Sequence, residues 1–355
     1  MIRGKRGESM KRIEFHDRER ETKGIMDILN SEPSLITFVY GPINSGKTTL
    51  ITHLIGQLSE VYVPFYINLR GRFITDYEDF LNVLFEIDEG DVIDNISEYA
   101  QSLLKDLKIL SGIPIPVNLF EQIFEKKDKS KDMFKYIERF FVEISKKRVP
   151  VLIIDELQVI GDMKIDGILV YKLFNFFVRL TKELHLAHIF VITSDSLFIE
   201  QVYSEAMLEG RCRYLLVDDF DYETTTTFLD GHGFTVDENA LAWEYCGGKP
   251  VCLVELVNTK QSSGSIVEMS GRMLREEVSR LIFMLARNIE RKSDIIEMLS
   301  IFASVEAVEY SDSMDLDLLS FLVKQNILFL DPVERTIKPQ SRLNLSAIRE
   351  VVKNA

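Results

Sequence analysis

The segment Gly41-Pro42-Ile43-Asn44-Ser45-Gly46-Lys47-Thr48 constrains the fold of this chain more than any other feature. It follows an apolar run, Leu35 to Tyr40, and precedes a stretch of helical character from Thr49 to Leu58. The two glycines let backbone N–H groups turn toward an anion, and the positive end of the following helix adds to that attraction. A simple glycine turn would not require the Lys-Thr pair, so the pattern predicts a phosphate-binding loop.

The side chains of this loop indicate a nucleoside triphosphate, and we expect ATP, converted to ADP, with Mg²⁺ as cofactor. Lys47 is expected to bridge the β- and γ-phosphates, and Thr48 to offer its hydroxyl to the metal. The candidate nucleotide-binding residues of the loop are Gly41, Pro42, Asn44, Ser45, Gly46, Lys47, Thr48 and Thr49.

A second apolar run, Val151 to Ile154, ends in Asp155 and Glu156. Alone it is compatible with a strand that happens to end in a polar turn. Beside a phosphate loop it is the expected second half of the same site. We expect Asp155 to hold the magnesium ion and Glu156 to polarise the attacking water, with Lys47 as a further catalytic group.

Two more segments carry polar residues where they could serve a nucleotide. A strand from His188 ends in Thr193 and Ser194, which would act as sensors of the γ-phosphate if this strand lies between the two motif strands. Capping of the next helix by Ser194 or Asp195 explains the same residues equally well. Arg211 is a candidate catalytic charge stabiliser, at this nucleotide or at a neighbouring molecule's, although pairing with nearby acids is the simpler explanation.

Five apolar runs alternate with helical segments, which predicts an α/β core over residues 15–220, with a parallel sheet and helices on both faces. The long gap between the second and third runs predicts a helical insertion at about 75–135, with a break at 111–116. Short helices over 221–260 predict a helical lid. Residues 275–355 are predicted to form a winged-helix-like domain, because helices there lead to two apolar strands around a turn at 326–339. Residues 1–14 are expected to be flexible.

Composition narrows the classes of function. The net charge of −14 and a pI near 5.0 disfavour nucleic acid as a partner, because the long-range field repels phosphates. Three irregularly spaced cysteines and five histidines without metal-ligand spacing argue against a disulfide framework and a metalloenzyme. No segment approaches the roughly 20 apolar residues that a membrane span requires, so we expect a cytoplasmic protein without membrane contact.

The chain resembles the archaeal ATPase family, within the AAA+ and STAND-like P-loop proteins. The resemblance is carried by Phe15 to Glu21, Gly41 to Thr48, Ile153 to Gln158, Thr193-Ser194, Gly210-Arg211 and Gly247-Gly248-Lys249-Pro250. It implies an ATPase core, a lid and a C-terminal winged helix. It also implies that Asp17, Arg18 and Glu19 lie near the adenine and that Pro250 lies against the nucleotide. The chain departs from the family pattern at Thr193, where glycine is usual, and at Leu157, where phenylalanine is frequent.

Three functions are compatible with these features. The leading one is an ATPase whose hydrolysis switches the arrangement of core, lid and C-terminal domain in regulation or signalling, with a protein partner and with low activity in its absence. The alternative is a nucleic-acid-binding regulator that uses the winged helix, with ATP as conformational effector. The third is an ATP-stabilised scaffold with negligible turnover. Fold alone does not choose among them.

Overall fold

The structure is a computed structural model that describes residues 13, 15–88, 95–104, 110–125, 129–160, 167–205, 208–311 and 314–354. Apart from residue 13, the segment 1–14, for which we expect flexibility, lies outside the described residues.

A parallel five-stranded sheet forms the centre of the core, in the order β2-β5-β6-β1-β7. Each of the five apolar runs forms one of its strands, as predicted: β1 (Ile36–Tyr40), β2 (Tyr62–Asn68), β5 (Val149–Asp155), β6 (His188–Thr193) and β7 (Cys212–Leu216). The strand β6 lies between β5 and β1, the two strands that precede the candidate motifs. All three carboxyl ends therefore meet at one edge of the sheet.

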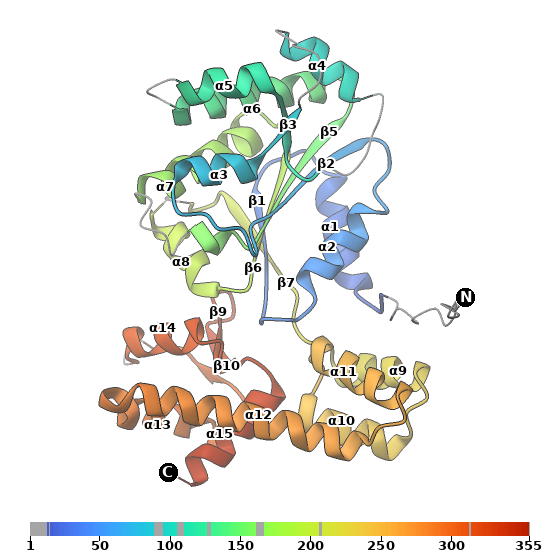
Figure 1. Ribbon diagram of the computed structural model, residues 1–355, viewed down its shortest axis with the longest axis vertical. Coiled ribbons are helices and arrows are strands. Elements are labelled where there is room, and N and C mark those ends of the chain that lie inside the picture. The colour runs from blue at the N-terminus through green and yellow to red at the C-terminus, as the bar shows by residue number, and fades with distance from the viewer. Residues whose placement is uncertain are drawn as a thin grey trace, which may run out of the picture.

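Helices cover both faces of this sheet (Figure 1), and the alternation of strand side chains explains why. On one face, Val39, Ile153 and Ile192 pack against α1 (Glu19–Leu29) and α2 (Lys47–Ile55). On the other face, Phe38 and Ile154 pack in the largest apolar cluster with α6 (Lys129–Ser145), α7 (Gly167–Val178) and α8 (Ser196–Glu205). Burial on both faces explains why the strands read as continuous apolar runs.

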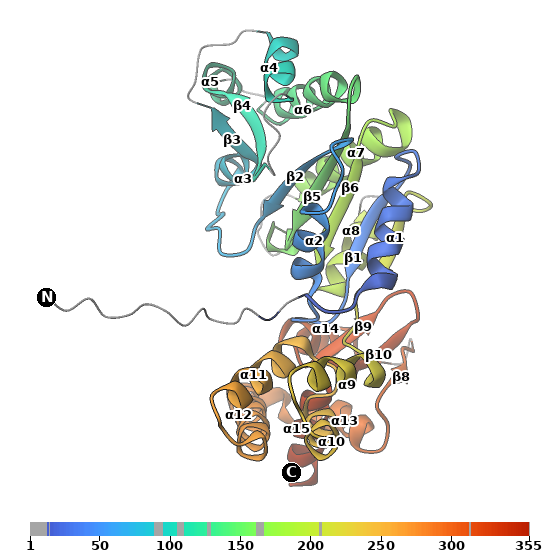
Figure 2. The same ribbon diagram turned by 90° about the vertical axis from the view of Figure 1, so that its right-hand side faces the viewer.

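The insertion between β2 and β5 is not purely helical, and this corrects our prediction. It contains α3 (Tyr77–Leu84), β3 (Phe85–Asp88), α4 (Ile96–Leu103), β4 (Ile113–Pro116), α5 (Val117–Glu125) and α6. The expected break is the strand β4, which pairs in parallel with β3. Its Ile113 and Ile115 are fully buried. Pro114 and Pro116 are tolerated because each strand of a two-stranded sheet is an edge strand. Figure 2 shows these elements next to the edge of the five-stranded sheet that β2 forms.

The remainder of the chain is a helical unit followed by a mixed one. The first contains α9 (Tyr222–Gly231), α10 (Val236–Cys246) and α11 (Pro250–Gln261). The second contains α12 (Ile266–Arg287), α13 (Lys292–Ser300), β8 (Val308–Glu309), α14 (Leu316–Lys324), β9 (Leu328–Asp331), β10 (Thr336–Pro339) and α15 (Arg342–Lys353). The hairpin expected at 326–339 is β9-β10, and β8 adds a third antiparallel strand in the order β8-β10-β9. The strand β8 and the helix α15 were not predicted.

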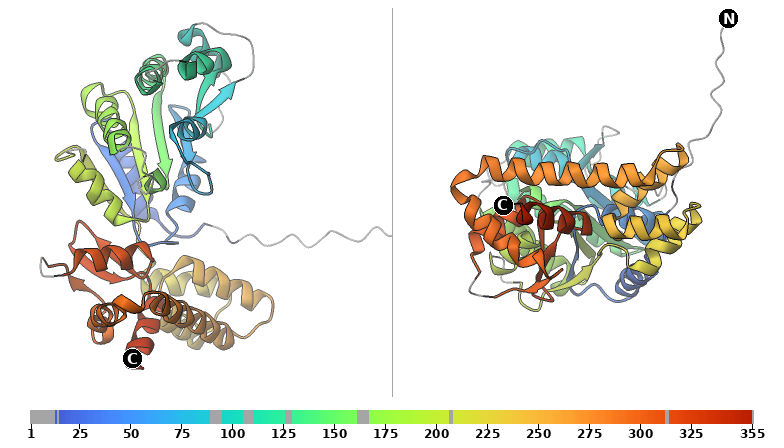
Figure 3. Two further views of the ribbon diagram at one scale, coloured as in Figure 1. Left: turned by 60° about the vertical axis from the view of Figure 1, so that its left-hand side comes forward. Right: turned by 90° about the horizontal axis from the view of Figure 1, so that it is seen from below.

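The helix α12 links the two units, because it packs against α10 and α11 at one end and against α15 at the other. The view from below in Figure 3 shows that α12 extends along both the helical unit and the mixed unit. It runs without a break from Ile266 to Arg287, so the predicted boundary at 275 falls inside a helix. Both units lie below the carboxyl edge of the sheet (Figure 1). None of the helices in the described part of the chain has the length and hydrophobicity that a transmembrane span needs.

Candidate functional site

The loop between β1 and α2 has the backbone shape that a phosphate site requires. Gly41, Asn44 and Gly46 have positive φ angles of 155°, 59° and 94°. A Cβ atom at Gly41 would lie 2.1 Å from the carbonyl oxygen of Val217, so only glycine fits there. The helix α2 begins at Lys47, directly after the loop. Its unpaired N-terminal N–H groups therefore face the space that the loop encloses.

The Lys47 ammonium group is held inside this loop. Its Nζ donates hydrogen bonds to the carbonyl oxygens of Gly41 at 2.9 Å and Pro42 at 2.8 Å, and the residue is only 6% exposed. Burial, followed by the nearby Lys249 ammonium, lowers the pKa of Lys47 to about 8. The carboxylates of Glu156, Asp155 and Asp219 act on this pKa in the opposite direction, and burial outweighs them.

A hydroxyl and a carboxylate meet beside the loop. The Thr48 hydroxyl donates to Asp155 Oδ2 at 2.7 Å, and the Tyr66 hydroxyl from the neighbouring strand donates to the same oxygen at 2.8 Å. Asp155 is fully buried, and its Oδ1 has no hydrogen-bond partner among the described residues. A buried carboxylate oxygen without a partner fits Mg²⁺, which prefers oxygen ligands and keeps several waters. Thr48 and Asp155 are the residues that would hold it.

Glu156 follows in a left-handed backbone conformation, with φ of 62°. Its N–H donates to the carbonyl oxygen of Ile192 at 3.0 Å, which ties the residue to β6. Its carboxylate contacts Arg70 at 3.2 Å through Oε1 and accepts a short hydrogen bond from Gln158 through Oε2. Gln158 also accepts a hydrogen bond from the Thr193 hydroxyl at 2.8 Å. The structure thus brings together Glu156 and Thr193, one of the two candidate sensors, through a glutamine.

Of the two explanations for the polar end of β6, helix capping holds at Asp195, and the sensor function of Thr193 and Ser194 stays a prediction. Thr193 faces the site, whereas Asp195 accepts hydrogen bonds from the N–H groups of Leu197 at 2.9 Å and Phe198 at 3.3 Å. Asp195 therefore caps α8. Ser194 lies between these two residues in the chain.

The N-terminal segment supports the loop from outside. Arg18 is 5% exposed, and its Nη2 donates at 2.7 Å to the carbonyl oxygens of both Ser45 and Asp218. Its guanidinium also lies 4.5 Å above the ring of Phe220. Asp17 accepts a hydrogen bond from Thr224 at 3.2 Å. Arg18 thus joins the loop to the strand end after β7, and Asp17 joins the same segment to α9.

The Gly-Gly-Lys-Pro segment reaches the loop through its lysine, a contact that the sequence did not reveal. Lys249 is 4% exposed, donates to the carbonyl oxygen of Ile43 at 2.9 Å and pairs with Asp219 at 2.9 Å. A Cβ atom at Gly248 would lie 1.7 Å from the carbonyl oxygen of Phe220, so glycine is required there by close packing. The candidate Pro250 begins α11.

The C-terminal hairpin also contacts the loop, and sequence reasoning missed this as well. The Tyr40 hydroxyl donates to Asp331 Oδ1 at 2.9 Å, and the N–H of Ile43 donates to Gln340 Oε1 at 3.0 Å. Gln340 is 2% exposed and Asp331 is 4% exposed. We call these two contacts the hairpin clasp. In the sequence, Asp331 and Gln340 appear only as polar residues at the ends of two apolar strands, a signal that is not specific.

The structure does not bring Arg211 to the site. Its carbonyl oxygen accepts the N–H of Ile36 at 3.0 Å, which places it at the start of β1 and β7. The loop lies at the other end of β1, roughly 16 Å away for five residues of strand. Within one molecule, Arg211 therefore does not act on a nucleotide in this loop.

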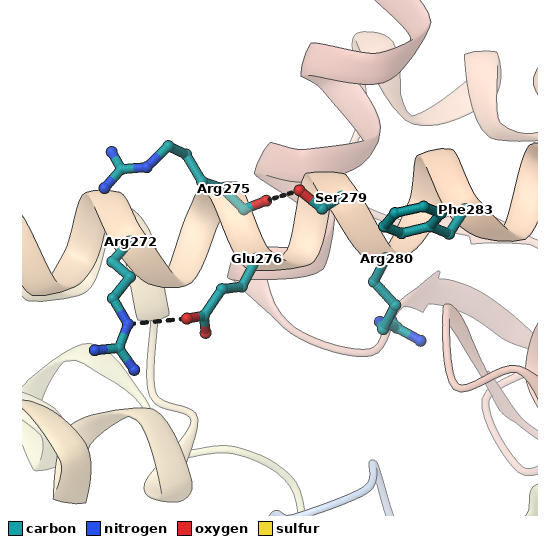
Figure 4. Close-up of a pocket in the computed structure, with 6 residues that line it drawn as sticks. All are labelled: Arg272, Arg275, Glu276, Ser279, Arg280 and Phe283. Atoms are coloured by element: carbon teal, nitrogen blue, oxygen red, sulfur yellow. Dashed lines mark hydrogen bonds and ion pairs between the residues drawn. The ribbon is translucent and has the colours of Figure 1, made fainter.

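An open groove of about 400 Å³ lies elsewhere, along the solvent face of α12 (Figure 4). It is lined by Arg272, Arg275, Glu276, Ser279, Arg280 and Phe283. Arg272 pairs with Glu276 at 2.8 Å along the helix. The loop residues do not line this groove, so it is separate from the candidate nucleotide site.

Comparisons with known proteins identify the family of this chain. Residues 15–256 match the family described as "ATPase domain predominantly from Archaea", and residues 267–352 match "Uncharacterized ATP-binding protein MJ1010-like, C-terminal domain". An uncharacterized ATP-binding protein of Pyrococcus abyssi is 46% identical over 340 residues, covering 96% of this chain and 99% of that protein. One from Methanocaldococcus jannaschii is 44% identical over 355 residues, covering 96% and 98%.

A solved structure shows the same fold. A Walker-type ATPase of Pyrococcus abyssi aligns over 94% of this chain and 96% of its own, with a TM-score of 0.62 and 16% sequence identity. The family match covers more than half of the chain, and the relatives align over nearly all of it. This chain therefore belongs to the archaeal ATPase family.

Proposed function

We propose that this protein hydrolyses ATP to ADP and phosphate, and that the nucleotide controls how the lid and the C-terminal unit sit on the core. The observation that carries the first part is the contact of Thr48 with Asp155 at 2.7 Å beside the phosphate loop, with Glu156 next in the chain. This arrangement supports an anion, a divalent cation and a general base within one small site.

The chain's own residues divide the work in this proposal. Backbone N–H groups of residues 44 and 46–48 and the Lys47 ammonium bind the phosphates and stabilise charge on the γ-phosphoryl group as it is transferred. Glu156 accepts a proton from the attacking water, whose oxygen bonds to the γ-phosphorus while the bond to the β,γ-bridging oxygen breaks. When bound at Thr48 and Asp155, Mg²⁺ supplies positive charge that offsets the phosphate oxygens.

The contacts at Ile43 support the second part of the proposal. Lys249 from the lid bonds to the carbonyl oxygen of this residue, and Gln340 from the C-terminal unit bonds to its N–H group. A change in loop conformation at this residue therefore reaches both units directly. A nucleotide shifts such an arrangement only by its differential affinity for the two states.

Hydrolysis is tested with Glu156→Gln, which keeps the shape of the side chain and removes its charge. We expect Mg·ATP affinity within a few-fold of the parent protein and single-turnover hydrolysis slower by roughly 10²–10⁴. The matched control is Glu183→Gln, at an exposed carboxylate at the far end of the sheet. Equal hydrolysis rates in parent and Glu156→Gln would remove Glu156 from this role.

The switch is tested by small-angle scattering on the nucleotide-free protein, on its ADP and non-hydrolysable ATP complexes, and on Glu156→Gln with ATP. We expect distinct profiles for the ADP and ATP-like states. Superimposable profiles in all states would leave an ATP-binding protein without a nucleotide-driven rearrangement.

The arginines on α12 favour a second candidate, a regulator that binds nucleic acid. Arg272, Arg275 and Arg280 lie on one solvent face within an otherwise acidic chain. Glu276 on the same face and the net charge of −14 oppose it. Sub-micromolar binding of the full chain to duplex DNA with a steep salt dependence, lost in Arg275→Ala, would favour this candidate over a protein-directed switch.

A further inference from the structure

A chain of hydrogen bonds connects the end of β6 to Glu156. The N–H of Asp195 donates to Thr193 Oγ1 at 3.0 Å, and the Thr193 hydroxyl donates to Gln158 Oε1 at 2.8 Å. The Gln158 amide nitrogen then donates to Glu156 Oε2. Gln158 lies in a short helical turn, Leu157–Ile160, which begins one residue after Glu156.

The direction of this chain follows from the chemistry of its members. The Thr193 hydroxyl has one proton, and Gln158 Oε1 at 2.8 Å is a nearer acceptor for it than the carbonyl oxygen of Asp195 at 3.3 Å. The carbonyl end of the Gln158 amide can only accept, so it faces Thr193, and its NH₂ end faces the carboxylate. Thr193 is 1% exposed, and hydrogen bonds that follow one another at low dielectric strengthen each other.

Gln158 is the better placed of the two partners of the Glu156 carboxylate. The Arg70 side chain is 58% exposed, and an ion pair of such a residue contributes little because water screens it. Gln158 comes from a turn fixed by the bond from the N–H of Val159 to the carbonyl oxygen of Glu156 at 3.0 Å. The backbone of Glu156 is itself tied to β6. The carboxylate orientation is therefore set mainly through the amide.

We propose that Gln158 is a positioning residue for hydrolysis, which holds the Glu156 carboxylate toward the attacking water and is itself oriented by Thr193. This inference rests on the proposed ATPase function and adds to it a role for a residue that lies between Glu156 and Thr193. Gln158 acts through Glu156 and does not touch the reacting atoms. Its loss therefore lowers the rate of the chemical step without weakening the binding of ATP.

The kinetic test compares Gln158→Leu and Thr193→Val with the parent, because both replacements nearly preserve volume. For Gln158→Leu we expect kcat to fall by roughly 10- to 100-fold while KM for ATP stays within about twofold, as for a misplaced catalytic group. Thr193→Val is expected to lower kcat in the same direction. The double variant should be no slower than Gln158→Leu, because both changes break one chain. Gln101→Leu, at an exposed glutamine in the insertion, is the control.

A second test needs no turnover. In the nucleotide-free protein, the side-chain NH₂ signals of Gln158 are assigned by their loss in Gln158→Leu. We expect Thr193→Val and Glu156→Ala each to shift these signals, and Gln101→Leu to leave them in place. Signals that stay fixed in both site variants would overturn the proposed chain.

The two tests separate the inference from the function on which it rests. A parent protein that turns over no faster than Glu156→Gln would refute the proposed ATPase, whereas the NH₂ signals would still decide the hydrogen-bond chain. A parent that hydrolyses ATP, together with a Gln158→Leu variant of unchanged kcat, would refute the positioning role alone. Additive losses in the double variant would refute the link through Thr193.

Discussion

Replacing Tyr40 by phenylalanine removes one hydroxyl from the hairpin clasp and nothing else. Tyr40 is 2% exposed and ends β1, and burial together with the Asp331 carboxylate raises its pKa above the ordinary value. A hydrogen bond to a charged group contributes about 1.5–3 kcal/mol. In Tyr40→Phe, Asp331 Oδ1 still accepts hydrogen bonds from the N–H groups of Val333 at 2.9 Å and Glu334 at 3.1 Å. We therefore expect a loss at the low end of this energy range. That loss shifts the docking equilibrium of the hairpin roughly tenfold.

The assay is amide hydrogen exchange, because the N–H of Ile43 bonds directly to the hairpin through Gln340. We expect Tyr40→Phe to speed exchange at Ile43 and along β9-β10 by roughly tenfold, in line with the estimated loss. The matched control is Tyr136→Phe in the insertion, which removes a buried hydroxyl that donates to the carbonyl oxygen of Pro114 at 2.7 Å. The free energy of unfolding should fall by a similar amount in both variants. Only Tyr40→Phe should speed amide exchange at Ile43. Equal protection of Ile43 in the two variants would refute the clasp.

Three further predictions concern other parts of the chain. Lys47→Ala should abolish tight ATP binding, since it removes the main counter-charge to the β- and γ-phosphates. The affinity is measured by calorimetry, and an unchanged value would contradict the assignment of this loop as the ATP site. His188 has its pKa lowered from 6.5 to about 4, by burial first, so the unfolded chain takes up its proton first as pH falls. The stability present above pH 6.5 is therefore lost toward pH 4, by about 2 kcal/mol between pH 7 and pH 5 in urea unfolding, and His188→Asn should flatten that dependence. Gly248→Ala should lower the free energy of unfolding by about 1–3 kcal/mol, because the added Cβ would clash with the Phe220 carbonyl. Gly231→Ala should leave the stability unchanged, because a Cβ there has no atom within 4 Å. Equal melting temperatures of the two variants would contradict this packing argument.

Local patterns in the sequence predicted the sheet well, because its strands are buried on both faces and therefore read as uninterrupted apolar runs. The β1 strand begins within one residue of the predicted run at Leu35. The insertion was harder, since a two-stranded sheet leaves short and proline-interrupted segments such as Ile113–Pro116. Those residues read as a break by every local rule, and only their pairing with β3 makes them a strand.

The candidate site divides in a similar way. Thr48 and Asp155 were predictable as partners because a known chemistry requires a hydroxyl and a carboxylate at one phosphate loop. Lys249 and Gln340 were not, because their contacts depend on how the helical unit of α9 to α11 and the C-terminal unit pack on the core. Arg211 was placed by motif alone, and the parallel pairing of β7 with β1 shows that it starts its strand at the far edge of the sheet.

The hairpin clasp also has a consequence for the order in which the molecule becomes complete during synthesis. Tyr40 and Asp331 are 291 residues apart in sequence, and Ile43 and Gln340 are 297 apart. The N-terminal part of a chain emerges from the ribosome first, and contacts between distant residues form only after both partners exist. The nucleotide loop therefore acquires its last structural support only when translation has passed residue 340, so a truncated chain keeps the loop sequence without the hairpin that braces it.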